Sequence, residues 1–291
     1  MSFRQTLFHS ASMLREAAMY EKFFEMEHTP FTRNIPTDRL YMSPAIEDAI
    51  GRLKYSADNE QFAVVMAEPG CGKSTLVRMF AARLPKDQYL PLYLSDSKLT
   101  PRWLYAGLLD QMGVEAKFYR GDSKRILQRE IDNIRSTQNK KVVCILDEAH
   151  LLGRETLEEF RFLLNRNFDS TSPMALILVG QKELWEQKLR LQTYTAIRQR
   201  IDMHVILERL DRADTSKYMQ THLAYSGCRT ELFTSDAEDE IYKISTGIPR
   251  MINGICTKAL MYAYQQQKRL IDGSMIRYVA DHEMLQEDNS V

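Results

Sequence analysis

The chain has 291 residues and an ordinary globular composition, with 44% hydrophobic and 27% charged residues. Lysine plus arginine equals aspartate plus glutamate at 39 each, so the formal net charge is zero. This balance excludes a histone-like polycation and a globally acidic protein, although it leaves room for a local basic surface. The hydrophobic fraction excludes wholesale disorder, and the length predicts one large domain or two modest ones.

The cysteines and the first residues indicate the cellular compartment. Cys71, Cys144, Cys228 and Cys256 are too far apart for a CxxC pair, so they predict reduced thiols, neither a zinc site nor a disulfide framework. The first twenty residues lack the continuous apolar stretch of a signal peptide, and 18 apolar residues never run together. The sequence therefore predicts a cytoplasmic protein without a membrane span.

Helical patterns and short apolar runs follow one another along the first two thirds of the chain. A helix over 45–55 is predicted to begin with Pro44. Strands are predicted at Phe62–Met66, Tyr89–Leu94, Val142–Leu146, Ala175–Val179 and Val205–Leu207. The helices between them are predicted at Ser74–Leu84, Arg102–Met112, Lys124–Arg135 and Glu155–Asn167. Such alternation predicts a parallel sheet with helices on both faces, and Pro91, which cannot donate a ladder hydrogen bond, places its strand at the sheet edge.

The pattern changes after Leu210, where the strand signals end. The remaining segments predict four helices, at Thr215–Ser226, Asp236–Ser245, Pro249–Gln267 and Ser274–Gln286. Glycines stand at their boundaries. We therefore predict an α/β domain to about residue 211 and a small helical domain after it.

A glycine-rich loop lies between the first strand and its helix. The phosphate-binding pattern Gly-x4-Gly-Lys-Ser/Thr is met at Gly72, Lys73 and Ser74, but Ala67 occupies the first glycine position. Ala67 is tolerated if its backbone keeps a negative φ. Lys73 is expected to reach the β- and γ-phosphates of ATP, and Ser74 to ligate Mg²⁺. The predicted nucleotide-binding residues of the loop are Pro69, Gly70, Cys71, Gly72, Lys73, Ser74 and Thr75.

An acid pair follows the strand Val142–Leu146. Ligands of open α/β sheets bind at the carboxyl ends of the strands, so Asp147 and Glu148 are expected beside the phosphate loop. We assign Asp147 to the Mg²⁺ shell and nucleotide site, and Glu148 to polarising the attacking water. The tetrad Asp-Glu-Ala-His also occurs in helicases, but the residues after 211 predict a small helical bundle in place of a second nucleotide-gripping domain.

Three further motifs complete a family pattern: Gly180-Gln181, Ile197 to Ile201, and Gly247 to Arg250. Together with the phosphate loop they resemble an AAA+ ATPase, an αβα domain followed by a helical lid. The resemblance implies sheet order 5-1-4-3-2, Gln181 as sensor 1, Arg250 as sensor 2, and Arg198 or Arg200, with preference for Arg200, as an arginine finger that works in a homo-oligomeric ring or filament. It also implies an N-terminal segment, 1–60, packed on the ATPase core, the P-loop domain at 61–211 and the lid at 212–291.

The opening residues narrow the resemblance. Met19 to Phe24, Pro30-Phe31 and Leu40 to Ser43 look like the start of ExeA/GspA-type ATPases, a group close to the transposition regulators of the TnsC, TniB and MuB type. The secretion ATPases typically continue into a membrane span, whereas this chain stops after the lid. That departure favours the soluble, transposon-borne members.

A basic stretch at residues 98–141 carries ten lysines and arginines against five acids. Such patches bind phosphates without sequence preference, although a solvated helix face has the same composition. The candidate DNA contacts are Lys98, Arg102, Lys117 and Arg120. The leading hypothesis is thus an ATP-dependent AAA+ protein that oligomerises on double-stranded DNA and activates a transposase. A secretion-associated ATPase and a nucleotide-dependent signalling switch are the alternatives.

Overall fold

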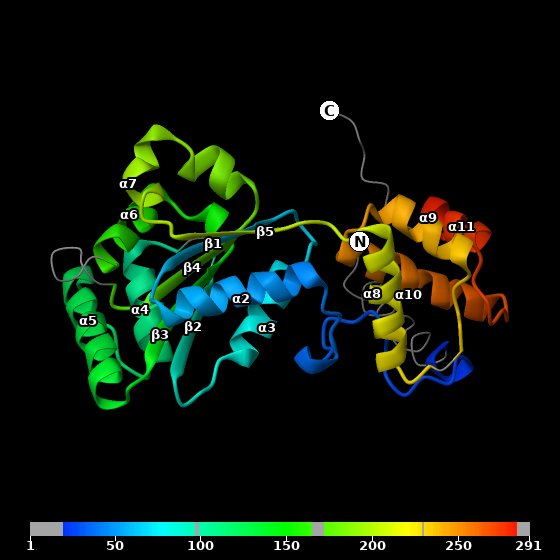
Figure 1. Ribbon diagram of the computed structural model, residues 1–291, viewed down its shortest axis with the longest axis horizontal. Helices are drawn as coiled ribbons and strands as arrows, with labels where there is room; N and C mark the ends of the chain where they lie inside the picture. The colour runs from blue at the N-terminus through cyan, green and yellow to red at the C-terminus, as the bar shows by residue number, and fades with distance from the viewer. Residues whose placement is uncertain (1–19, 97–98, 165–171, 229, 284–291) are drawn as a thin grey trace, which may run out of the picture. The chain divides into compact units, whose positions relative to one another are not determined.

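The computed structural model describes residues 20–96, 99–164, 172–228 and 230–283. The chain divides into two compact units (Figure 1). The sheet unit runs from Pro44 to Glu208. The helical unit combines the chain from Arg209 onward with the segment that ends at Ser43.

Five parallel strands form the centre of the sheet unit. Their order is β2-β3-β4-β1-β5, which confirms the predicted order. The strand that contains Pro91 lies at an edge, as its missing N–H predicts. The strands are β1 (Phe62–Ala67), β2 (Tyr89–Ser95), β3 (Lys141–Asp147), β4 (Ala175–Gly180) and β5 (Met203–Leu207).

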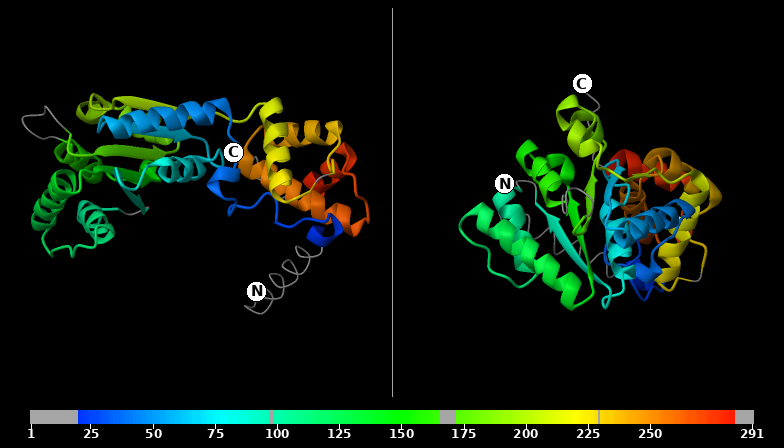
Figure 2. Two further views of the ribbon diagram at one scale, coloured as in Figure 1. Left: turned by 60° about the horizontal axis from the view of Figure 1, so that its bottom comes forward. Right: turned by 60° about the vertical axis from the view of Figure 1, so that its left-hand side comes forward.

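Helices cover both faces of this sheet (Figures 1 and 2). Residues Phe62, Val64 and Met66 of β1 alternate onto one face, where they join the core formed with α4, α5 and α6. Helices α2 and α3 contact strands from the other face. The helices are α2 (Pro44–Asp58), α3 (Lys73–Arg83), α4 (Pro101–Gln111), α5 (Arg120–Thr137), α6 (Arg154–Leu163) and α7 (Thr195–Arg198).

The short helical turns of the sheet unit carry too little periodicity for prediction from sequence. They are the 3₁₀ turns η2 (Ala149–Leu151) and η4 (Gln192–Tyr194), and the π-helical turn η3 (Leu184–Leu189). The predicted extension of α6 to Asn167 falls on residues outside the described ranges. The start of α4 is set by Thr100, whose hydroxyl accepts the N–H of Trp103 and whose neighbour Pro101 fits the first helical turn.

Within the described residues, the helical unit contains four long helices and the 3₁₀ turn η1 (Thr37–Arg39), with aromatic residues of the preceding segment in its core. Tyr20, Phe24 and Phe31 are buried there among the helix residues. The helices are α8 (Arg212–Tyr225), α9 (Ser235–Ser245), α10 (Pro249–Gln265) and α11 (Gly273–Glu283). In the parts of the chain that the structure describes, none of the helices is long and apolar enough to cross a membrane.

The unit boundaries differ from the predicted domain boundaries. The prediction packed residues 1–60 on the ATPase core, whereas among the described residues of this range those from Pro44 onward group with the sheet unit. The described residues before Pro44 group with the helical unit, because their aromatic side chains complete its apolar core. The predicted boundary at 211 lies close to the observed change at Arg209.

Candidate functional site

The phosphate loop joins β1 to α3, as predicted. Gly70 and Gly72 have φ angles of 84° and 92°, in the left-handed region that favours glycine. Ala67, at the first glycine position of the motif, is the last residue of β1 and pairs with Leu207 of β5. Its backbone is therefore extended, which any residue adopts, and this explains why alanine is tolerated there.

Lys73 begins α3, and its side chain bends back over the loop. Its Nζ donates to the carbonyl oxygens of Ala67 (3.2 Å) and Glu68 (3.1 Å). Lys73 is buried and is the first residue of α3, so its cation and the helix N-terminus belong to the same loop. A cation combined with a helix N-terminus is a suitable environment for phosphate oxygens.

The first acidic residue lies next to this loop. Asp147 is the last residue of β3 and is buried. Its Oδ2 accepts the hydroxyl of Ser74 at 3.1 Å and the hydroxyl of Tyr93 at 2.9 Å. Its Oδ1 accepts the N–H of Glu148 at 2.8 Å. The structure therefore brings together the two predicted metal-binding residues, which are 73 positions apart.

These oxygens suit a magnesium ion. Mg²⁺ prefers hard oxygen ligands and usually keeps several waters while it binds one or two protein groups and substrate phosphates. Ser74 and Asp147 provide one hydroxyl and one carboxylate, within hydrogen-bond distance of each other. Among the described residues there is no cluster of three or more histidine, cysteine or acidic side chains that would form an all-protein cage. The residues present fit a Mg²⁺ held jointly with a nucleotide.

Glu148 adopts an unusual backbone conformation. Its φ of 53° lies in the left-handed region, which a residue with a side chain seldom occupies. The carboxylate is 42% exposed, and its Oε2 lies 3.4 Å from Nδ1 of His150. Strained backbones of this kind cluster at functional sites. Glu148 thus presents a solvent-accessible carboxylate directly beside the buried Asp147.

The tip of β4 lies between the tips of β1 and β3, because β4 pairs with both strands. Gln181 follows its last residue, Gly180. A Cβ on Gly180 would lie 3.2 Å from the backbone nitrogen of His150, so glycine permits the close approach of the acidic turn. Lys182, which sequence reasoning missed, forms an ion pair of 2.8 Å with Glu68 of the phosphate loop.

The three candidate arginines have different surroundings. The guanidinium of Arg198 donates to the carbonyl oxygens of Leu189 (3.2 Å) and Arg190 (2.6 Å), so it holds the preceding turn in place. Arg200 is half-buried shortly before β5, and Arg250 is an exposed residue of the first turn of α10.

Three of the four candidate DNA contacts are exposed. They are Arg102, Lys117 and Arg120, while Lys98 lies outside the described residues. Arg120 forms an ion pair of 3.1 Å with the buried carboxylate of Glu159. The prediction did not foresee this ion pair, which takes up part of the charge of Arg120.

An aromatic–arginine cluster accompanies these cations and consists of Arg102, Trp103, Phe118 and Tyr119. Its three aromatic residues are 60%, 72% and 70% exposed. The Arg102 guanidinium lies 4.8 Å from the ring centre of Phe118 and 6.0 Å from that of Trp103. Large exposed rings of this kind mark interaction surfaces.

The Glu159 carboxylate of α6 binds side chains of α4 and α5, the two helices next to this surface. It accepts the hydroxyl of Tyr105 from α4 and pairs with Lys124 (3.3 Å) and Arg120 (3.1 Å) of α5. Burial alone would raise the pKa of Glu159, but these partners outweigh it and lower the pKa. The ionised carboxylate therefore ties α4, α5 and α6 together.

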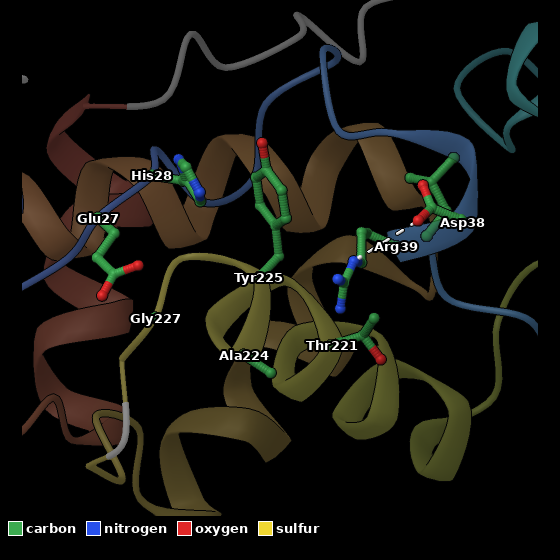
Figure 3. Close-up of a pocket in the computed structure, with 9 residues that line it drawn as sticks. Glu27, His28, Asp38, Arg39, Thr221, Ala224, Tyr225 and Gly227 are labelled. Atoms are coloured by element: carbon green, nitrogen blue, oxygen red, sulfur yellow. Dashed lines mark ion pairs between the residues drawn. The ribbon is translucent and has the colours of Figure 1, made fainter.

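A separate hollow of about 470 Å³ lies within the helical unit (Figure 3). The rings of His28 and Tyr225 stack there at 5.0 Å, and Asp38 pairs with Arg39 at 3.7 Å. Its acidic and basic residues lie side by side, so the hollow favours neither an anion nor a cation. Sequence reasoning did not single it out.

The loop after β1 and the acid pair after β3 have the arrangement that is typical of P-loop nucleotide-binding domains. Residues 56–187 match the family model described as AAA domain.

The chain is also similar to a curated secretion protein. It is 32% identical over 253 residues to general secretion pathway protein A of Aeromonas hydrophila. The match covers 84% of this chain but 45% of the relative, so the chain spans less than half of the relative's length.

Solved structures share the fold. Cdc6p from Pyrobaculum aerophilum has a TM-score of 0.68 at 15% identity, covering 88% of this chain and 70% of that one. The Drosophila ORC bound to DNA has a TM-score of 0.63 at 15% identity, covering 91% and 65%. The Aeropyrum pernix ORC1 protein in complex with DNA gives 0.61 at 12% identity, covering 81% and 64%. At these identities the likeness concerns the fold alone.

Proposed function

We propose that this chain is a Mg²⁺-dependent ATPase whose nucleotide cycle drives the assembly of a larger complex. The observation that carries the proposal is the contact between Ser74, beside the phosphate-loop lysine, and the buried Asp147 at the end of β3. A hydroxyl and a carboxylate in this relation form the metal-binding half of a P-loop site.

Each residue of the site has a distinct task in this proposal. The loop N–H groups and Lys73 bind the phosphates, and Ser74 and Asp147 hold Mg²⁺, which when bound neutralises charge on the transferred phosphate. Glu148 orients and polarises the attacking water through its accessible carboxylate. Gln181, at the tip of β4, is the proposed sensor of the γ-phosphate, and Arg250 stays the proposed second sensor.

The proposed cellular role is secretion-associated, as the name of the Aeromonas relative states for that protein. The identity of 32% supports it, and the AAA domain is consistent with it. This role takes precedence over the predicted transposition role, for which sequence motifs are the support.

The experiment compares ATP turnover and ATP binding in the parent and in Glu148→Gln. The amide keeps the shape of the side chain but cannot polarise water, so turnover should fall by about 10²–10⁴ while binding persists. Glu155→Gln, an exposed glutamate at the start of α6, is the matched control and should behave as the parent. Parent protein that binds ATP without turning it over would favour the signalling switch, and a Glu148→Gln protein within threefold of the parent would exclude Glu148.

The second candidate function is binding of double-stranded DNA in an assembly that acts on a transposase. The aromatic–arginine cluster with Lys117 favours it, because cations and exposed rings together suit nucleic acid. Its test is DNA affinity against salt concentration for Arg102→Ala/Lys117→Ala, with an ATP analogue present. The salt slope should decrease by roughly one unit per lost phosphate contact.

The matched control for that test is Lys86→Ala/Lys140→Ala. These lysines precede β2 and β3, so they lie at the amino ends of the strands, away from the carboxyl ends where the proposed nucleotide site lies. An equal change of slope in both double variants would argue against the cluster as the DNA surface. Absence of salt-dependent DNA binding by the parent would leave the secretion role.

A further inference from the structure

Tyr93 of the edge strand β2 reaches the proposed metal site. Its hydroxyl donates to Oδ2 of Asp147 at 2.9 Å, and the same oxygen accepts Ser74 at 3.1 Å. With the Glu148 N–H on Oδ1, the Asp147 carboxylate receives three donors from three different parts of the chain. The proposed function assigns no role to Tyr93.

A second contact fixes the position of Tyr93. As β2 is an edge strand, it has no further strand to pair with beyond Tyr93. Gln111, the last residue of α4, takes that place: its Oε1 accepts the Tyr93 N–H at 2.8 Å, and its Nε2 donates to the Tyr93 carbonyl at 2.7 Å. The two hydrogen bonds of the Gln111 amide fix the backbone of β2 at Tyr93, and they therefore fix the position from which the tyrosine side chain extends.

The tyrosine hydroxyl is the donor in its hydrogen bond with the Asp147 carboxylate. Burial and this hydrogen bond raise the pKa of Tyr93 to about 12. A donor that is fixed in place sets the orientation of the carboxylate oxygen that accepts from it.

We propose that Tyr93 is a positioning residue for Mg²⁺, acting through Asp147. It orients the carboxylate toward Ser74, so that both oxygens are in place before the nucleotide arrives. Residues that hydrogen-bond to a metal-binding carboxylate set its orientation, and their loss typically lowers metal affinity about 10–100-fold. The inference rests on the proposed function, because it concerns the metal of the same site.

The test measures ADP binding by calorimetry at a series of Mg²⁺ concentrations and, separately, with the metal chelated. In Tyr93→Phe the Mg²⁺ concentration for half-maximal enhancement of ADP binding should rise about tenfold. ADP affinity in chelator should equal that of the parent, because Tyr93 is placed to act on the metal. The paramagnetic signal of Mn²⁺ in the ADP complex gives a direct second readout of metal affinity.

Tyr89→Phe is the matched control. Tyr89 lies on the same strand, and its hydroxyl also binds a carboxylate, that of Asp58, but at the opposite end of β2. Both variants should lose a similar amount of thermal stability, while Tyr93→Phe alone changes the Mg²⁺ dependence. Gln111→Met, which removes the amide that holds Tyr93, should shift it in the same direction by a smaller factor.

The outcomes separate the inference from the function beneath it. Equal Mg²⁺ dependence in the parent, Tyr93→Phe and Tyr89→Phe would overturn the role of Tyr93 and leave the ATPase proposal standing. Tighter Mg²⁺ binding by Tyr93→Phe would also overturn it. Parent protein that binds ADP neither with nor without Mg²⁺ would overturn the proposed function itself.

Discussion

The phosphate loop requires glycine where the backbone turns left-handed. Gly70 and Gly72 meet that requirement, with φ angles of 84° and 92°. Ala67 precedes the turn as the last residue of β1, so its side chain imposes no conformational cost. The loop can therefore adopt the phosphate-binding conformation although alanine replaces the first glycine of the motif.

Replacing Ala67 by glycine tests this explanation. We expect Ala67→Gly to leave ATP affinity within about twofold of the parent and to cost roughly 0.5–1 kcal/mol in unfolding free energy, because glycine is more flexible in a strand. Titration with a fluorescent ATP analogue and urea unfolding measure the two quantities. A large gain in affinity would show that alanine distorts the loop.

At the scale of elements, glycine also sets the turn between α9 and α10. Gly247 has a φ of 77°, and a Cβ built there would lie 1.9 Å from the carbonyl oxygen of Leu210. The Leu210 N–H donates to the Gly247 carbonyl at 2.9 Å. The turn thus fixes the start of α10, and with it Arg250, against the chain that leads into α8.

Gly247→Ala should therefore destabilise the helical unit by at least about 2 kcal/mol, from backbone strain and the forced shift of Leu210. Gly254→Ala is the matched control, since its Cβ would meet nothing within 4 Å inside α10. That variant should be neutral or slightly stabilising. Urea unfolding of both proteins is the measurement, and equal midpoints would contradict the account.

Helix α8 carries a buried histidine with no hydrogen-bond partner for either ring nitrogen among the described residues. His222 lies between the rings of Phe31 (5.4 Å) and Tyr218 (4.2 Å). Burial lowers its pKa from 6.5 to about 4. The neutral ring packs as an apolar group against Phe31, and this contact holds the segment before α2 on α8.

The lowered pKa of His222 makes the stability of the fold depend on pH. Above about pH 6.5, His222 is neutral in both the folded and the unfolded protein, so it does not reduce the free energy of unfolding. As the pH falls from 6.5 toward 4, the unfolded protein binds a proton at His222 first, so the free energy of unfolding decreases. Between pH 7.5 and pH 5 the loss should be about 2 kcal/mol. Hydrogen exchange of the α8 amides measures it, and His222→Phe should abolish the loss. The exposed His282→Phe is the control and should keep it.

At the scale of the whole molecule, an arginine supplied by a neighbouring subunit would make turnover depend on assembly. Arg198 holds the carbonyl groups of Leu189 and Arg190 within its own chain. That structural task favours Arg200 as the proposed finger. The two arginines can be separated by experiment, because a finger acts on the site of another subunit.

Arg200→Ala should bind ATP as the parent does and lose about 10³-fold or more in turnover. Mixing it with Lys73→Ala should restore part of the activity, because a Lys73→Ala subunit still supplies its arginine to an intact neighbouring site. Arg198→Ala should instead lower thermal stability. Steady-state turnover of the single and mixed proteins is the measurement; without recovery on mixing, the finger assignment would be wrong.

Local patterns alone determined much of the fold. The alternation of apolar runs and helices predicted the parallel sheet, Pro91 placed β2 at its edge, and the glycine-lysine loop predicted the start of α3. These features are local because they depend on backbone conformation and on which residues can enter a ladder. The position of Asp147 and Glu148 beside the phosphate loop was also predicted from the sequence, because the carboxyl ends of parallel strands lie at the same edge of a sheet.

Only the tertiary structure decided which side chains meet across elements. Tyr93 and Asp147 are 54 positions apart, and Lys182 and Glu68 are 114 apart. Tyr20, Phe24 and Phe31 became part of the helical core by the same kind of long-range contact. Hydrogen bonds depend on tenths of an ångström and on strand register, which emerge when the elements pack, so no local pattern in the sequence encodes them.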